Sequence, residues 1–302
     1  MEVGYFLPSK ATRNCSAVEL LKLSRQRAQE FLRQGVTTLE IKSGYGLSLK
    51  DEVKCLQVIQ KISELKTVST FLGAHAKPPE FDSYEKYLNF LAEEVLPVVR
   101  RKKLAERVDI FIENGFFPEE ASRHYLQKAK ALGFAVTIHA DQLSLSGGTL
   151  AAVDLNALSA DHVIQIKEDE IRKISQSETT AVLLPAADLY MKCNYPPARA
   201  LLDAGARVAL ATDFNPGTSP TQDLSLVGLL ARLEMKMTLP EVINAYTLGA
   251  AYALGKQNQR GTLEVGKDAD FYLHRWFVDR FVLLSRNHSC TAGDNRRKIK
   301  AY

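Results

Sequence analysis

The stretch RVALATDFNPGT, residues 207–218, has the pattern of a buried strand that ends in a loop next to a carboxylate. Val208 to Ala211 is a short apolar run of strand composition. Asp213 follows where that strand should end, and Asn215-Pro216-Gly217 then breaks the backbone. A charged residue at the C-terminal tip of a buried strand is where parallel α/β barrels carry their chemistry. Alternatively, Asp213 only caps the next helix, and the upstream chain has to decide between the two interpretations.

Upstream of this stretch, short β-branched or apolar runs alternate with longer segments of helical periodicity. Strands are expected at 36–41, 68–72, 108–112, 134–138, 157–161, 180–184 and 207–212. Helices are expected at 16–34, 49–65, 83–103, 118–132, from 148, and at 167–177, 197–204, 223–235 and 239–254, after an irregular start over 1–12. This alternation predicts βαβ units and a parallel sheet. Seven strands fit a TIM-like (β/α)₈ barrel that lacks its first strand, and an open doubly wound sheet is the alternative.

Composition places the chain among ordinary globular proteins. Its 302 residues are 46% hydrophobic and 25% charged, which suffices for one large core. The net charge of +4 is small and spread along the chain, so we expect no nucleic-acid partner. The four cysteines have no paired spacing, which favours a reducing compartment. With no signal-like start and no apolar run near ~20 residues, the expected location is the cytoplasm, away from membranes.

Polar residues recur at the predicted strand ends. If Asp213 ends strand eight, His162 ends strand six, His139 ends strand five, His75 ends strand three and Tyr45 follows strand two. In a closed barrel all of them would converge on one mouth. Each histidine alone could instead be a satisfied loop or core residue, and Tyr45 could simply pack on the rim.

The cluster has the chemistry of a hydrolytic metal site. Imidazole and carboxylate are the ligands of zinc or ferrous iron, and a bound metal lowers the pKa of its water toward ~7. A nearby carboxylate can take the proton and return it to a leaving nitrogen, while an adjacent histidine can hold the oxyanion. His139, Asp213 and His162 fit these three roles. We expect His124 to lie on the surface, and His274 and His288 to be uninvolved.

Five motifs together resemble the imidazolonepropionases, the metal-dependent amidohydrolases of histidine degradation. They are EIKSGYGL (40–47), FLGAH (71–75), IHADQL (138–143), SADH (159–162) and ATDFNPGTSP (211–220), and the resemblance extends from about residue 10 to 271. It implies an amidohydrolase barrel that hydrolyses the cyclic amide of 4-imidazolone-5-propanoate to N-formimidoyl-L-glutamate.

The resemblance also implies residue roles. His139 and Asp213 match the ligands of one divalent ion, Zn or Fe, and His162 and Asp213 match the catalytic positions. The substrate-binding positions of the family match Tyr45, His75, Asn215, Gly217 and Thr218. Gln142 falls where some members carry a glutamate, so its role in substrate binding stays open.

Two departures from the family affect the expectations. Family members begin with β-strands and a first barrel strand that carries a His-x-His metal-ligand pair and then a substrate-binding arginine, and the chain starts after them. From His274 the tail also diverges, so we expect a barrel over 1–255 and a remnant of the small β-sandwich over 256–302.

The departures leave two alternatives to an active enzyme of this family. One is an inactive fragment that acts, if at all, as an interaction protein. The other is a related deaminase, which the NPGTSP loop and the Tyr45 motif disfavour. Because two ligands and one strand would be missing, we expect residues 1–302 alone to be poorly soluble or to form a homodimer by edge pairing, and to bind little zinc.

Overall fold

The computed structural model describes residues 2–271, 290–292 and 299–301, and its centre is a parallel sheet of seven strands. The strands are β1 (Thr38–Lys42), β2 (Lys66–Ala74), β3 (Arg107–Ile112), β4 (Ala135–Ala140), β5 (Ser159–His162), β6 (Thr180–Leu183) and β7 (Val208–Leu210). All seven predicted strands are confirmed, with ends that differ by a few residues.

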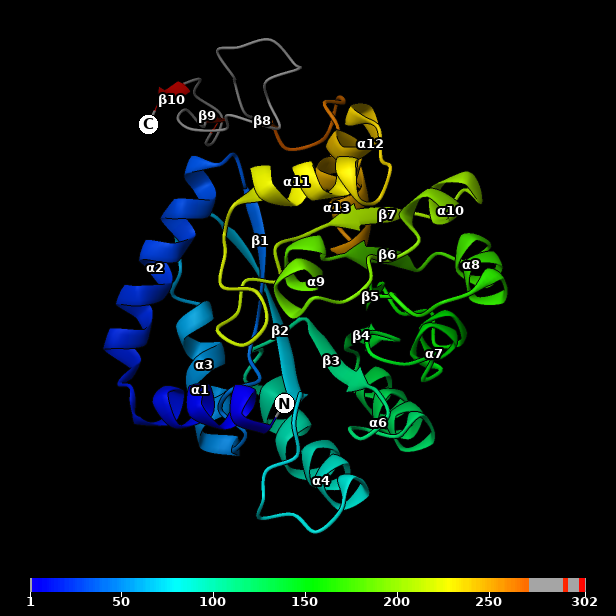
Figure 1. The fold of residues 1–302 in the computed structure, drawn as a ribbon. Helices are drawn as coiled ribbons and strands as arrows, with labels where there is room; N and C mark the ends of the chain where they lie inside the picture. Colours follow the sequence, from blue (N-terminus) through cyan, green and yellow to red (C-terminus); the bar gives the residue numbers. More distant parts are fainter. Residues whose placement is uncertain (1, 272–289, 293–298, 302) are drawn as a thin grey trace.

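The strands lie in the sheet in the same order as in the chain, β1 to β7, and every neighbouring pair is parallel. A doubly wound sheet reverses its strand order at a switch point, so that alternative is wrong. Successive crossovers of one kind instead curl the sheet toward a barrel (Figure 1). Among the described residues β1 pairs only with β2 and β7 only with β6, so the curled sheet stays open between β1 and β7.

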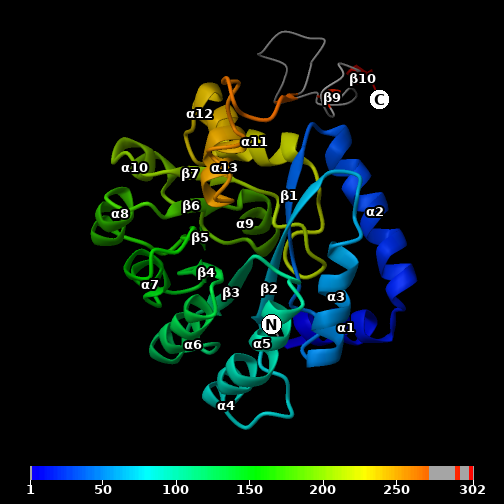
Figure 2. The ribbon, with the colours of Figure 1, turned by 180° about the vertical axis from the view of Figure 1, so that it is seen from behind.

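Helices surround the outer face of this sheet (Figures 1 and 2). Those before β4 are α1 (Glu2–Asn14), α2 (Ala17–Arg33), α3 (Leu49–Ile59), α4 (Tyr84–Phe90), the π-helical turn η1 (Leu91–Val95), α5 (Leu96–Arg101) and α6 (Glu119–Ala131). Those after β4 are α7 (Gly148–Asp154), α8 (Glu168–Ser175), α9 (Pro185–Met191), α10 (Ala198–Asp203), α11 (Leu224–Leu233), α12 (Leu239–Asn244), η2 (Ala245–Gly249) and α13 (Ala250–Ala253).

Local signals explain where several helices begin. The side chains of Ser16, Ser48 and Ser83 each accept a hydrogen bond from the backbone N–H three residues later, and Asp223 caps α11 in the same manner. Each cap satisfies a backbone donor that the first helical turn leaves free. The helices that the periodicity predicts are therefore confirmed, although α3 ends at Ile59 rather than near 65.

Two local expectations are wrong. The start is not irregular, because α1 covers Glu2–Asn14 with Pro8 inside it. No helix was expected between the strand at 180–184 and residue 197, but Pro185 opens α9 there, where its missing N–H costs nothing at the first helical position.

The last helices pack closely against edge strand β7. A side chain at Gly249 would place its Cβ only 2.0 Å from the carbonyl oxygen of Val208. Only glycine allows this approach, which packs η2 directly against β7 and so covers one face of this edge strand.

A second, three-stranded antiparallel sheet joins β8 (Asp270–Phe271), β9 (Cys290–Ala292) and β10 (Ile299–Ala301). The division into a barrel over 1–255 and a remnant over 256–302 stays a prediction, and His274 and His288 lie outside the described residues. Within the described part of the chain, no helix combines the length and the apolar character needed to span a bilayer.

Candidate active site

One cavity of about 1330 Å³ lies at the carboxyl ends of the strands and extends toward the gap between β1 and β7. Every residue that the sequence singles out for the site lines it: Tyr45, His75, His139, Gln142, His162, Asp213, Asn215, Gly217 and Thr218. These residues come from five strand ends and from sequence positions up to 173 apart. The predicted convergence on one mouth is confirmed, whereas the roles of the residues stay proposals.

Four rings form a continuous row along the cavity floor. The ring centroids of Tyr45 and His75 are 5.3 Å apart, those of His75 and His139 6.0 Å, and those of His139 and His162 5.4 Å. His139 thus lies in the middle of the row, between the rings predicted to hold substrate and the ring predicted to assist chemistry. His124, in contrast, is exposed on α6, as expected.

The backbone is strained at two of these positions. His162 has φ 77° and Asp213 has φ 51°, both in the left-handed region that non-glycine residues rarely adopt. Such strain persists only where the surroundings impose it and often accompanies function. Here both residues leave the end of a strand, and the unusual φ turns the chain away as it enters the loop.

The loop after Asp213 is organised by Asn215. Its Oδ1 accepts hydrogen bonds from the N–H groups of Gly217 (2.8 Å) and Thr218 (2.7 Å), and its Nδ2 donates to the Asp213 carbonyl oxygen (2.6 Å). This is the self-bonding turn typical of asparagine. The side chain therefore fixes the loop shape, so any contact of the loop with substrate would fall to the groups that Asn215 positions.

Asp141 and Gln142, which follow His139 in the chain, have different surroundings: Asp141 bonds the following loop, and Gln142 faces the cavity. The carboxylate of Asp141 accepts the N–H groups of Ser146 (2.7 Å), Gly147 (2.9 Å) and Thr149 (2.8 Å), which shapes the start of α7. Gln142 is buried against the cavity, with Nε2 3.6 Å from the sulfur of Met191. Asp141 is thus a structural residue, and Gln142 keeps an amide near the site.

Burial controls the protonation of the outer histidines. It lowers the pKa of His75 to about 3 and that of His162 well below its ordinary value, and the neighbouring His139 lowers both further. Both rings are therefore neutral at physiological pH, so each has one nitrogen that can donate a hydrogen bond and one that can accept one or bind a metal. Burial also raises the pKa of Asp213 to about 6, against the opposing effect of His139 and Lys42.

Beneath the row of rings lies a charged cluster that the sequence analysis did not assign. The Lys42 ammonium donates to Asp109, lies 2.9 Å from Asp161 Oδ2, and lies 3.6 Å from Glu40 Oε2. Asp109 Oδ1 in turn lies 3.0 Å from His139 Nδ1. Burial opposes the charge on Lys42, but the surrounding carboxylates raise its pKa well above the ordinary value. The cluster joins β1, β3, β4 and β5 across the inside of the sheet.

One sequence signal could have identified this cluster. Charged residues two apart lie inside otherwise apolar strands, Glu40 with Lys42 and Arg107 with Asp109. Side chains two apart in a strand share a face, and a pair of charges on the inner face of a barrel strand has to find partners there.

The metal that the sequence predicts can be tested against the donors present. Asp109, His139 and Asp161 offer ligand atoms within 4.8 Å of one another, the one such group of three among the described residues. Lys42 already pairs with both of its carboxylates, so this group resembles an occupied ion cluster rather than a metal site. Because Asp109 occupies Nδ1 of His139, the other ring nitrogen is the one left to bind a metal.

Unpartnered polar atoms beside the cavity fit an added cation. Nδ1 of His162 is buried without a hydrogen-bond partner, and so are both carboxylate oxygens of Asp188 on α9. Burial and the neighbouring charge of Asp213 raise the pKa of Asp188 to about 8. Buried polar atoms normally have partners, so the donors around Asp213 and His162 fit a bound cation on this side.

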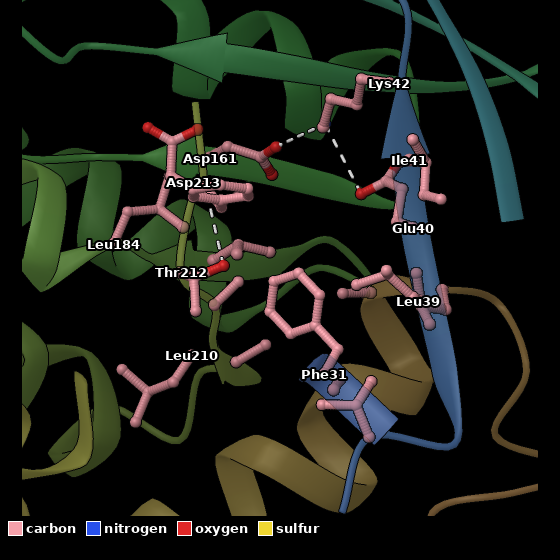
Figure 3. Close-up of a pocket in the computed structure, with 18 of the residues that line it drawn as sticks. Phe31, Leu39, Glu40, Ile41, Lys42, Asp161, Leu184, Leu210, Thr212 and Asp213 are labelled. Atoms are coloured by element: carbon pink, nitrogen blue, oxygen red, sulfur yellow. Dashed lines mark hydrogen bonds and ion pairs between the residues drawn. The ribbon is translucent and has the colours of Figure 1, made fainter. Parts of the chain in front are cut away.

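The same cavity opens into the gap between the two sheet edges (Figure 3). Leu39, Glu40, Ile41 and Lys42 of β1 line one wall, and Leu184, Leu210, Thr212 and Asp213 line the other. Phe31, from α2, projects between the two walls. The gap is therefore apolar beside Phe31 and charged near Lys42 and Asp213.

Comparison with known proteins assigns the family. A family model described as amidohydrolase family matches residues 7–282. The imidazolonepropionase of Bdellovibrio bacteriovorus is 67% identical over 88% of this chain and 63% of its own length. That of Bacillus velezensis is 43% identical over 98% of this chain and 70% of its own length. The chain thus spans about two thirds of the length of these relatives.

Solved structures agree on the fold. An adenosine deaminase from Xanthomonas campestris with bound zinc superposes with a TM-score of 0.69 at 17% identity, over 92% of this chain and 70% of that one. A guanine deaminase from C. acetobutylicum with bound guanine gives 0.67 at 14% identity, over 92% and 74%. At these identities the likeness concerns the fold alone. With the family model and the curated relatives, it shows that this chain belongs to the amidohydrolase family, among the imidazolonepropionases.

Proposed function

We propose that the cavity hydrolyses the cyclic amide of 4-imidazolone-5-propanoate to N-formimidoyl-L-glutamate with the help of one divalent ion, Zn or Fe. The observation that carries this proposal is the convergence of all nine predicted residues on one cavity. Relatives named imidazolonepropionase at 43% and 67% identity support the substrate. These relatives favour the imidazolone substrate over the substrate of a related deaminase, because the likeness to the solved deaminases concerns the fold alone.

Each residue has a role that its position supports. His139, through the ring nitrogen that Asp109 leaves free, and Asp213 would hold the ion. When bound, such an ion supplies a water of lowered pKa at neutral pH. His162, neutral and next to His139, would donate a hydrogen bond to the oxygen that becomes negatively charged. Asp213 would accept a proton from the water and return it to the leaving ring nitrogen.

Substrate would be held by the rings on the other side of His139. Tyr45 and His75 meet edge to face, and His75 is neutral, so both can hydrogen-bond to a planar imidazolone ring. The loop that Asn215 shapes would close over the substrate from β7, and Gln142 would add an amide beside the ring.

The test uses the length difference between this chain and its relatives. In a chimera, residues 10–271 would replace the matching part of the Bacillus velezensis protein, whose remaining segments would complete the fold. We expect the chimera to remove the near-ultraviolet absorbance of the imidazolone ring as it opens, and residues 1–302 alone to do so far more slowly. A folded, metal-loaded chimera that leaves this substrate intact but deaminates guanine or adenosine would refute the proposal.

Two variants of the chimera separate the roles. His139→Ala should lose metal and turnover together, because it removes a ligand. His162→Ala should keep its metal and lose about 10²–10³-fold in kcat, as expected for one donor to a developing oxyanion. Metal content measured beside the kinetics checks both, and equal metal loss would show that His162 is a ligand.

A further inference from the structure

We propose that Asp109 is a positioning residue that fixes His139 in the tautomer with the proton on Nδ1, and that Lys42 holds Asp109 in place for this task. The inference deepens the proposed function, since it concerns the residue assigned to the ion. It names two residues to which neither the family resemblance nor the comparisons give a role. Its basis is the geometry of the buried cluster below the cavity.

The contact itself determines the tautomer. Asp109 is fully buried, and its Oδ1 lies 3.0 Å from His139 Nδ1. An ionised carboxylate only accepts hydrogen bonds. Nδ1 must therefore carry the hydrogen, which leaves the lone pair of a neutral ring on Nε2, the nitrogen that faces away from Asp109. Such a carboxylate behind a ligating histidine fixes both tautomer and ring orientation in metal sites.

The carboxylate of Asp109 is itself held from two further directions. Its Oδ1 also accepts the N–H of Ile110 at 2.7 Å, and its Oδ2 accepts a hydrogen bond from the Lys42 ammonium. Lys42 comes from β1, Asp109 from β3 and His139 from β4, so three strands set the position of one imidazole ring. A group held at three points keeps its geometry when the loops above it move.

Asp161 provides a natural contrast within the same cluster. Its Oδ2 lies 2.9 Å from Lys42 Nζ and its Oδ1 accepts the Ser159 hydroxyl at 2.6 Å. It is opposite His139 in the sheet register, yet no hydrogen bond between them is found. Asp109 and Asp161 thus share the same cation and similar burial, and differ in whether they bond the histidine.

This contrast separates positioning from a purely structural ion cluster. If the cluster only fills and neutralises the inside of the sheet, removing either carboxylate charge should have the same consequence. If Asp109 positions His139, only its replacement should change the ring. Asp109→Asn and Asp161→Asn are therefore matched variants, each removing one negative charge from the partners of Lys42.

The decisive measurement is ¹⁵N NMR of the histidine rings in the metal-free chimera described above. Burial opposes the charge on His139, but Asp109 raises its pKa, so spectra are recorded over a rising pH series until the ring is neutral. They then report which nitrogen carries hydrogen, and the His139 signals are identified by their loss in His139→Gln. We expect the Nδ1–H form in the wild type and in Asp161→Asn. In Asp109→Asn the amide can donate to Nδ1, so the Nε2–H form should appear.

Zinc affinity of the same proteins, measured by competition with a chelating dye, gives a second readout. Asp109→Asn should bind zinc about 10–100-fold more weakly than Asp161→Asn, the usual effect of losing the carboxylate behind a ligating histidine. Nε2–H in the wild type, or an equal loss of affinity in both variants, would overturn the inference. The wild-type spectrum, assigned with His139→Gln, does not depend on Asp109→Asn, so it decides even if that variant fails to fold.

Neither readout involves turnover, so the two proposals can fail separately. An Nδ1–H ring in a chimera that does not hydrolyse the imidazolone would refute only the proposed function. An Nε2–H ring in an active chimera would refute only the role of Asp109.

Discussion

The middle of the sheet and its two edges differ in how completely they are covered. All six residues of β3 are buried between β2 and β4, whereas all five residues of β1 are only half-buried. Edge strand β7 has only three residues, and although all three are buried, it has a strand neighbour on one side only among the described residues. A parallel strand is stable when it has a neighbour on each side and helices on its outer face. The middle meets that condition, and the edges meet it on one side.

The two regions differ in charge as well. In the middle, the carboxylates of Asp109 and Asp161 share the ammonium of Lys42. Near the open edge, Asp188 has two buried oxygens without partners, and its pKa is raised to about 8 by burial and by Asp213. The carboxylates of the middle thus have a cationic partner from β1, while the carboxyl group of Asp188 has no hydrogen-bond partner beside the proposed metal position.

The largest expected effect comes from removing the shared cation. Lys42→Met leaves buried carboxylates without a counter-charge, which should lower the free energy of unfolding by about 3–5 kcal/mol. Lys86→Met is the matched control, because Lys86 pairs with Asp82 on the surface and should cost no more than about 1 kcal/mol. Urea unfolding followed by circular dichroism measures both. Similar losses in the two variants would mean that the cluster is effectively solvated.

The second prediction compares packing in the two regions. Ile110 on β3 is completely buried, so Ile110→Ala should cost about 2–5 kcal/mol through lost transfer energy and a new cavity. Leu39 on β1 is half-buried next to the gap, so Leu39→Ala should cost about 1 kcal/mol. The same unfolding curves give both values. A cost for Leu39 as large as that for Ile110 would indicate that the gap is filled in solution.

The third prediction uses pH. Because the folded-state pKa of Asp188 is raised to about 8 from 3.8, the folded protein keeps a proton that the unfolded chain has lost between these values. Stability from this group is therefore full at low pH and declines as pH rises toward 8. In metal-free protein, the free energy of unfolding of Asp188→Asn should increase relative to that of the wild type by about 2 kcal/mol between pH 5 and pH 7. Parallel stability curves would show that Asp188 finds a partner.

The sequence predicts the elements well because the information that specifies them is local. Short β-branched or apolar runs located all seven strands, and the predicted helix starts at 16 and 83 coincide with the capping residues Ser16 and Ser83. Prediction failed where the local signal is ambiguous. The start over 1–12, expected to be irregular, forms α1 with Pro8 inside it, and the helix α9 that Pro185 opens was not expected.

The site could be predicted only where strand order alone determines it. Polar residues at successive strand ends must converge once the sheet curls. The cavity residues could therefore be identified without knowing which side chains contact one another. The cluster around Lys42 could not be identified in this way. Lys42 meets Asp109, 67 positions along the chain, and Asp161, 119 positions along the chain, across the inside of the sheet. Which inward-facing charges meet depends on strand tilt and curvature, and the pattern of a single strand does not encode these.

The smallest expected effect concerns the exposed edge itself. The free side of β1 presents unpaired backbone groups, and such edges pair with other chains unless a charge prevents it. We expect residues 1–302 to self-associate through this edge, and Leu39→Lys to weaken the association about tenfold, which corresponds to about 1.4 kcal/mol. Lysine at the edge blunts pairing because two copies would bring like charges together. Combining Leu39→Lys with Lys10→Leu on exposed α1 restores the net charge, so the double variant serves as the control for net charge. Sedimentation velocity over a concentration series measures the effect. If the wild type stays monomeric at all concentrations, the gap between β1 and β7 is closed in solution, and the contrast between the middle and the edges of the sheet is smaller than the burial of β1 indicates.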